Sequence, residues 1–62
     1  MSKRVLEARM RQLLALDKNA YDIYSDLTEK VDMPTMKETF GKIAKDELKH
    51  VKLWQKLLLL LK

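Results

Sequence analysis

Apolar residues recur at alternating intervals of four and three along both halves of this 62-residue chain, and this heptad spacing strongly constrains its fold. Such spacing places side chains on one stripe of an α-helix, where they face a partner helix. The first stripe consists of Leu6, Met10, Leu13, Asp17, Ala20, Tyr24, Leu27 and Val31. The second stripe consists of Met36, Phe40, Ile43, Glu47, His50, Trp54, Leu57 and Leu61. The sequence therefore predicts an all-α protein made of two long helices.

A short turn near Pro34 separates the two predicted helices. Proline does not fit a helix interior but suits the first turn of a new helix, and Ser2 is a good N-cap for the first helix. We expect one domain with a helix over about 2–31, a turn over about 32–34 and a helix over about 35–61. So short a turn predicts an antiparallel helical hairpin.

The apolar face of each helix is wider than a single heptad stripe. With Asp17 and Glu47 assigned to heptad position a and His50 to position d, several e and g positions are also apolar. These are Leu14, Leu16, Tyr21, Ile23, Ala44, Val51, Leu53, Leu58 and Leu60. A face this wide indicates that each helix contacts two others, as in a four-helix bundle. One hairpin supplies two helices and is too small to enclose a core, so we expect it to self-associate as a homodimer or a higher homo-oligomer.

The composition limits the chemistry that the chain can perform. There is no cysteine, which excludes disulfides, iron–sulfur clusters and thiolate zinc sites. The longest leucine run, over residues 57–61, is far shorter than the roughly 20 apolar residues of a membrane span. The first residues, Met1-Ser2-Lys3-Arg4, are followed by a charged helix and no unbroken apolar stretch, so we expect no signal peptide and a soluble, cytoplasmic protein.

Three ionisable residues interrupt the two stripes at one height. If the chain reverses near residues 32–34, Asp17 lies between Glu47 and His50 of the opposing helix. The i, i+3 spacing of Glu47 and His50 brings both side chains to one helix face. Two copies would supply four carboxylates and two imidazoles, the donor set of a di-iron carboxylate site, and the four negative charges would balance two divalent cations. We therefore expect Asp17, Glu47 and His50 to bind metal, with two irons per dimer and manganese or zinc as alternatives.

Other residues near this height are candidates for supporting the metal ligands. Asp46 lies four residues before His50 and could accept a hydrogen bond from the free N–H of a ligand imidazole. Tyr21 and Tyr24 lie one to two turns from Asp17 and could donate to a ligand carboxylate. Trp54 is expected to pack in the core and shield the site.

Two segments resemble a known family. The stretch Asp17-Lys18-Asn19-Ala20-Tyr21-Asp22-Ile23-Tyr24 resembles the first ligand helix of rubrerythrin-type proteins of the ferritin-like superfamily. The stretch Phe40-Gly41-Lys42-Ile43-Ala44-Lys45-Asp46-Glu47-Leu48-Lys49-His50 is similar to their second helix, with its Ile-Ala and Glu-x-x-His pattern. The resemblance covers about residues 10–58 and implies that Asp17, Glu47 and His50 are metal ligands. With one helix pair in place of two, the chain is also similar to encapsulated ferritins, whose hairpins complete a di-iron site across a dimer interface.

The resemblance implies a ferroxidase-type oxidoreductase that oxidises ferrous iron with dioxygen or peroxide, in iron handling or oxidative stress. The chain differs from the family in having Asp17 where Glu is usual and in having no rubredoxin-like segment, which leaves the electron donor and any encapsulating shell open.

Two alternatives remain open at this stage. One is a non-catalytic assembly module, in which the polar residues of the stripes only set the helix register. The other is a polyanion-binding hairpin that uses a lysine stripe on the second helix, although no aromatic platform or recognition motif points to nucleic acid as a partner. The stripe consists of Lys42, Lys45, Lys49, Lys52 and Lys56.

Overall fold

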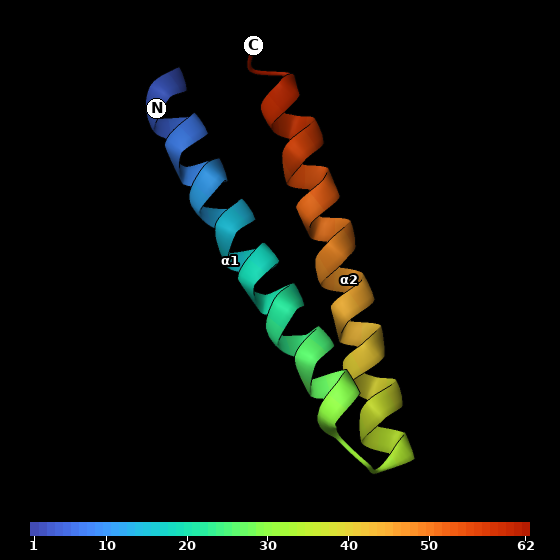
Figure 1. Cartoon of the computed structure of the whole chain (residues 1–62). Helices are drawn as coiled ribbons and strands as arrows, with labels where there is room; N and C mark the ends of the chain where they lie inside the picture. Colours follow the sequence, from blue (N-terminus) through green and yellow to red (C-terminus); the bar gives the residue numbers. More distant parts are fainter.

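The chain folds into two antiparallel α-helices joined by a short turn. The computed structural model describes all 62 residues, with helix α1 over Lys3–Lys30 and helix α2 over Pro34–Leu59. The helices are close together near the turn and diverge toward the two termini (Figure 1). The prediction of an all-helical hairpin is therefore confirmed.

The two helices begin in different ways. The hydroxyl Oγ of Ser2 accepts a hydrogen bond from the backbone N–H of Val5 at 3.2 Å, which satisfies one of the unpaired donors in the first turn of α1. Helix α2 begins with Pro34 in its first turn, and Met33 at the N-cap provides no side-chain hydrogen bond. Since proline has no N–H to satisfy, this start needs one fewer capping partner.

The last turn of α1 carries an exposed ion pair. The Nζ of Lys30 lies 2.9 Å from Oδ2 of Asp26, one turn earlier in the helix. This hydrogen bond, together with the negative charge of Asp26, raises the pKa of Lys30 above its ordinary value. Because the pair is exposed, we assign it a minor part in holding the turn.

The rows of residues at which the two helices contact each other differ from the rows of the predicted stripes. The three buried residues are Met10, Ala44 and Val51, which occupy one a position and two e positions. The a row and the e row thus form the interface within the hairpin. The half-buried residues of these rows are Glu7, Leu14, Asp17, Tyr21, Tyr24, Thr28, Val31, Phe40, Glu47, Trp54, Leu58 and Leu61. The d residues of the predicted stripes lie at the edge of this interface because the a/e rows point more directly at the partner helix.

The rows at d and g leave an open apolar face along one side of the hairpin. Leu6 and Leu13 of α1 line one cleft of about 470 Å³ together with Leu57 and Leu60 of α2, so these rows of the two helices share a side. We define the open face by its exposed large apolar residues. They are Leu6, Leu13, Leu16, Ile23, Met36, Leu53, Leu57 and Leu60.

The hairpin is elongated and contains little buried volume. Its principal extents are 47 × 14 × 14 Å and its radius of gyration is 14.4 Å, against about 11 Å for a compact domain of this length. Only three of its 62 side chains are buried, which is too few for an independent core. Neither helix carries an apolar stretch long enough to cross a lipid bilayer.

Candidate metal centre

The three predicted ligands lie at the middle of the hairpin. Asp17 is near the midpoint of α1 and Glu47 is near the midpoint of α2, so the antiparallel pairing places them at the same height. His50 follows Glu47 by one turn and projects from a d position toward the open face. Heptad spacing and the short turn are sufficient to produce this arrangement.

The structure brings Asp17, Glu47 and His50 together. One possible ligand atom from each residue lies within 4.8 Å of the other two. Nδ1 of His50 is 3.9 Å from Oε1 of Glu47, which is too far for a hydrogen bond and close enough for both atoms to bind one cation. The side chain of Glu47 is 19% exposed and that of His50 is 53% exposed, so the group runs from the helix interface out to the open face.

Asp17 has a partner that the sequence did not predict. The indole Nε1–H of Trp54 donates a hydrogen bond to Oδ2 of Asp17 at 2.8 Å. Every other side-chain hydrogen bond joins residues three or four apart within one helix or its cap, so this bond alone links α1 to α2. The sequence predicts only that Trp54 packs in the core and shields the site. Its position one turn beyond His50 was the sequence feature that could have pointed to this contact.

Glu47 has no such partner. Its carboxylate is half-buried and accepts no hydrogen bond from the hairpin, and its nearest basic group is His50. A half-buried carboxylate without a donor is costly unless a cation or solvent satisfies it. The oxygens of Glu47 still reach solvent, because no buried side-chain oxygen of the chain lacks a hydrogen-bond partner, so Glu47 is the acid of this group whose oxygens are both free to take a cation.

A hollow adjoins Asp17 and His50, two of the three side chains, on the open side. It has a volume of about 290 Å³ and is lined by Asp17, His50, Leu53, Trp54 and Leu57. Two polar side chains that can bind metal therefore meet two leucines and a tryptophan at its wall. A cation held here would have a carboxylate and an imidazole beside it and an apolar surround.

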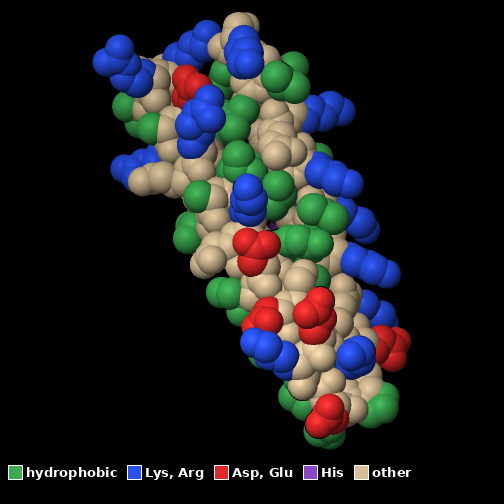
Figure 2. Space-filling view, in the orientation of Figure 1, with side chains coloured by type: hydrophobic (Ala, Val, Ile, Leu, Met, Phe, Trp, Pro, Cys, Tyr) green, Lys and Arg blue, Asp and Glu red, His purple; other side chains and the backbone are tan.

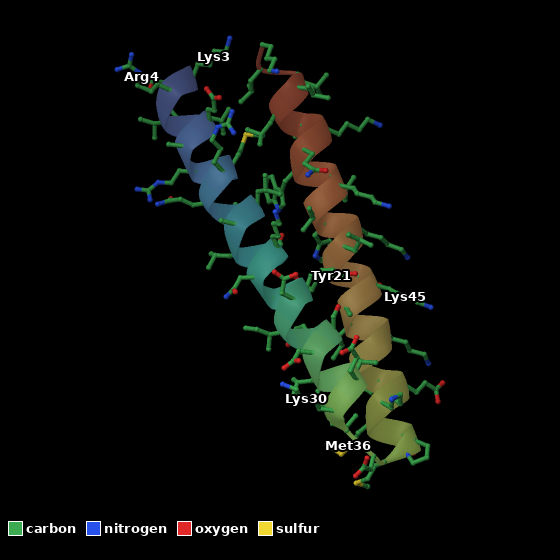
Figure 3. All side chains as sticks on the ribbon, in the orientation of Figure 1. Lys3, Arg4, Tyr21, Lys30, Met36 and Lys45 are labelled. Atoms are coloured by element: carbon green, nitrogen blue, oxygen red, sulfur yellow. The ribbon has the colours of Figure 1, made fainter.

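The three predicted supporting residues make no hydrogen bond to the ligands within one hairpin. Tyr24 packs against Phe40 with 6.2 Å between ring centroids. Tyr21 is half-buried on the side of α1 that faces α2 (Figure 3). Asp46 is exposed and has no ion pair. A g position such as Asp46 points toward the side on which a second hairpin would lie, so its predicted contact with a histidine stays a prediction.

The lysine stripe lies on the outer side of α2. All five of its lysines are exposed, and only Lys42 is paired, with Glu38 at 3.4 Å. Figure 2 shows basic side chains along the α2 edge of the molecule, and Figure 3 shows Lys45 pointing away from α1. The stripe is therefore remote from the three ligands and from the open face.

Comparison of the chain with protein-family models, with characterised proteins and with solved structures finds no match.

Proposed function

We propose that two copies of the hairpin pair through the open face into a ferritin-like four-helix bundle and form a di-iron carboxylate centre between them. The observation that carries this proposal is the grouping of Asp17, Glu47 and His50 within 4.8 Å, beside an unpartnered apolar face. The rubrerythrin-like segments described above support the same reading.

The surface area of the hairpin supports a second copy as the partner on the open face. A compact monomer of 7.3 kDa exposes about 4,200 Å². The hairpin exposes 5113 Å². The excess is close to the roughly 800 Å² that each partner buries in a stable complex. Covering the open face with one more hairpin would therefore bring the exposed area of each copy to that of an ordinary folded protein.

The height of the site supports two-fold symmetry. A two-fold axis perpendicular to the helices and passing through their midpoints would cover the face along its whole length. Because Asp17 and Glu47 lie at those midpoints, the same axis would bring both groups of ligands to one level. If the three residues lay near one end of the helices, the same axis would place the two copies of the group at opposite ends of the bundle.

The donor set fits iron. Carboxylate and imidazole together suit both common oxidation states of iron, and the four acids of a dimer balance the charge of two divalent ions. Glu47, which has no competing hydrogen bond, would hold the metal together with Asp17 and His50. The two acids would supply carboxylate oxygens, and His50 would supply an imidazole nitrogen. When bound, the di-iron group would supply the oxidation of ferrous iron by dioxygen or peroxide, while Leu53 and Trp54 limit water around it.

The test joins metal analysis to a mass measurement in solution. Protein purified without chelator and loaded anaerobically with Fe²⁺ is expected to be a dimer with two irons. Asp17→Asn should lose the metal because the amide removes one ligand charge, while Asp22→Asn, an exposed acid of the same helix, should retain it. A folded monomer, or a dimer that binds no iron, would refute the proposal.

One observation favours a second function, an assembly module without metal. Asp17 is already satisfied by Trp54, so its carboxylate can serve to set the helix register. In that case the dimer would form equally well with and without iron, and Asp17→Asn would change its stability without changing any metal content.

A further inference from the structure

The contact between Trp54 and Asp17 goes beyond the ligand set, and an inference from it rests on the proposed metal site. The indole N–H is half-buried and reaches across the hairpin to one oxygen of a half-buried acid. Oδ1 of the same carboxylate accepts no hydrogen bond. The two oxygens of Asp17 therefore differ in the metal-free hairpin, since Oδ2 is hydrogen-bonded and Oδ1 is not.

We propose that Trp54 is a positioning residue, which holds Oδ2 of Asp17 so that Oδ1 is presented to the metal. The terminal torsion of an aspartate is broad, and a carboxylate free to rotate would lose orientational freedom on binding. A hydrogen bond already present in the hairpin removes that cost. Metal ligands commonly depend on such a partner for their orientation.

The chemistry of indole suits this role. Its N–H donates only, does not ionise near neutral pH and cannot bind the metal itself. A histidine or an acid at the same place would compete for the cation or change charge with pH. Trp54 can thus orient Asp17 without adding a fourth ligand.

The indole ring of Trp54 also confines the carboxylate of Asp17, because the ring lies between two cavities. Trp54 lines both the hollow beside Asp17 and His50 and the apolar cleft toward the chain ends. It therefore stands between the candidate metal site and the wider cleft. Asp17 is consequently held on the side of the ring where His50 lies.

The test removes the donor and keeps the ring. Because the chain has 62 residues, it can be assembled by chemical synthesis with 3-benzothienylalanine at position 54, which replaces the indole N–H by sulfur in a ring of similar shape. The probe is Zn²⁺ alone, which is redox-inert, and its affinity is measured by calorimetry. Loss of an orienting partner of this kind lowers metal affinity about 10- to 100-fold. We expect that loss, with unchanged helix content and solution mass.

A second readout follows the hydrogen bond directly. The chain has one tryptophan, so its indole N–H gives a single nuclear magnetic resonance signal. This proton should exchange slowly with solvent in the parent, with and without Zn²⁺, and rapidly in Asp17→Ala. Asn19→Ala, which changes an exposed residue near Asp17 whose side chain makes no hydrogen bond, serves as the control and should leave both readouts unchanged.

Different results separate this inference from the proposed function. If the parent binds two Zn²⁺ per dimer and the sulfur-containing chain binds them equally well, Trp54 does not position Asp17, although the metal site stands. Rapid exchange of the indole proton in the Zn²⁺-bound parent would overturn the inference in the same way. A parent that takes up no stoichiometric Zn²⁺ or Fe²⁺ would overturn both.

Discussion

Two acids at the centre of the hairpin occupy equivalent heights and have different surroundings. Asp17 has an indole donor at 2.8 Å, whereas Glu47 has only His50, 3.9 Å away. Asp17 is thus stabilised in the hairpin alone, and Glu47 depends on what binds to it. This difference makes Glu47 and His50 the residues at which substitution reports most directly on metal.

His50→Ala is expected to abolish stoichiometric iron binding and leave the dimer intact. The imidazole is the only nitrogen ligand of the group, and its removal leaves a cavity of one side chain between the hairpins while the leucines of the open face remain. Alanine also has the highest helix propensity. Iron analysis with sedimentation checks this, with Lys49→Ala as the neighbouring control. Equal iron in the two variants would place the site elsewhere.

The grouping of Asp17, Glu47 and His50 could be predicted from the sequence, and the contact with Trp54 could not. Spacing alone sets the height of Asp17, Glu47 and His50, because both helices have a fixed rise and a short turn. A hydrogen bond from Trp54 depends on side-chain torsions and on the rotation of one helix against the other, which no spacing specifies. The expected contacts of Tyr21, Tyr24 and Asp46 depend on the same torsions, and spacing does not specify them either.

At the scale of the helices, the heptads predicted two long elements and left open which rows face which neighbour. The apolar arc covers positions a, d, e and g, so two adjacent pairings satisfy the pattern equally well. The hairpin uses a and e, and this rotation leaves d and g on the open face. Each predicted stripe therefore contains the a row, which lies in the hairpin interface, and the d row, which lies on the open face.

Leu57→Lys should dissociate the dimer, while Leu59→Lys should not. Both leucines are exposed in the hairpin, but Leu57 lies in the d row of the open face and Leu59 in the f row of the outer side. Burying one leucine contributes about 1.5–3 kcal/mol. A dimer contains two copies, so the dissociation constant should rise roughly 100-fold or more. Sedimentation over a concentration series measures this, and equal effects of the two changes would argue against pairing through the open face.

Gly41→Ala is expected to stabilise the protein by about 0.5–1 kcal/mol, because glycine weakens a helix interior by that amount relative to alanine. Gly41 is in α2, and an added Cβ would lie 3.8 Å from Cγ2 of Thr28, an ordinary contact distance. Denaturant unfolding of both proteins at one protein concentration tests this. A loss of stability would mean that α1 and α2 approach each other more closely in the assembly than in the hairpin.

At the scale of the whole molecule, an elongated hairpin with three buried residues has a folding stability that cannot be separated from its assembly. Dilution should therefore unfold the chain as well as dissociate it. In the proposed dimer each hairpin would contribute one half of the ligands, so the site is expected to behave in the same way.

The affinity for metal should consequently depend on protein concentration. Below the dissociation constant of the dimer, the chain is dissociated and unfolded, so Asp17, Glu47 and His50 are no longer held together and Zn²⁺ should bind more weakly. By thermodynamic reciprocity, Zn²⁺ must strengthen the dimer by the same factor. Saturation to about 100 times the dissociation constant of the metal should add about 2.7 kcal/mol per site to the free energy of unfolding. Calorimetric titrations at several protein concentrations, combined with sedimentation with and without Zn²⁺, measure both sides of this coupling. An affinity that is the same at every concentration would show that one hairpin completes the site by itself, and the two-fold arrangement would then have no part in binding metal.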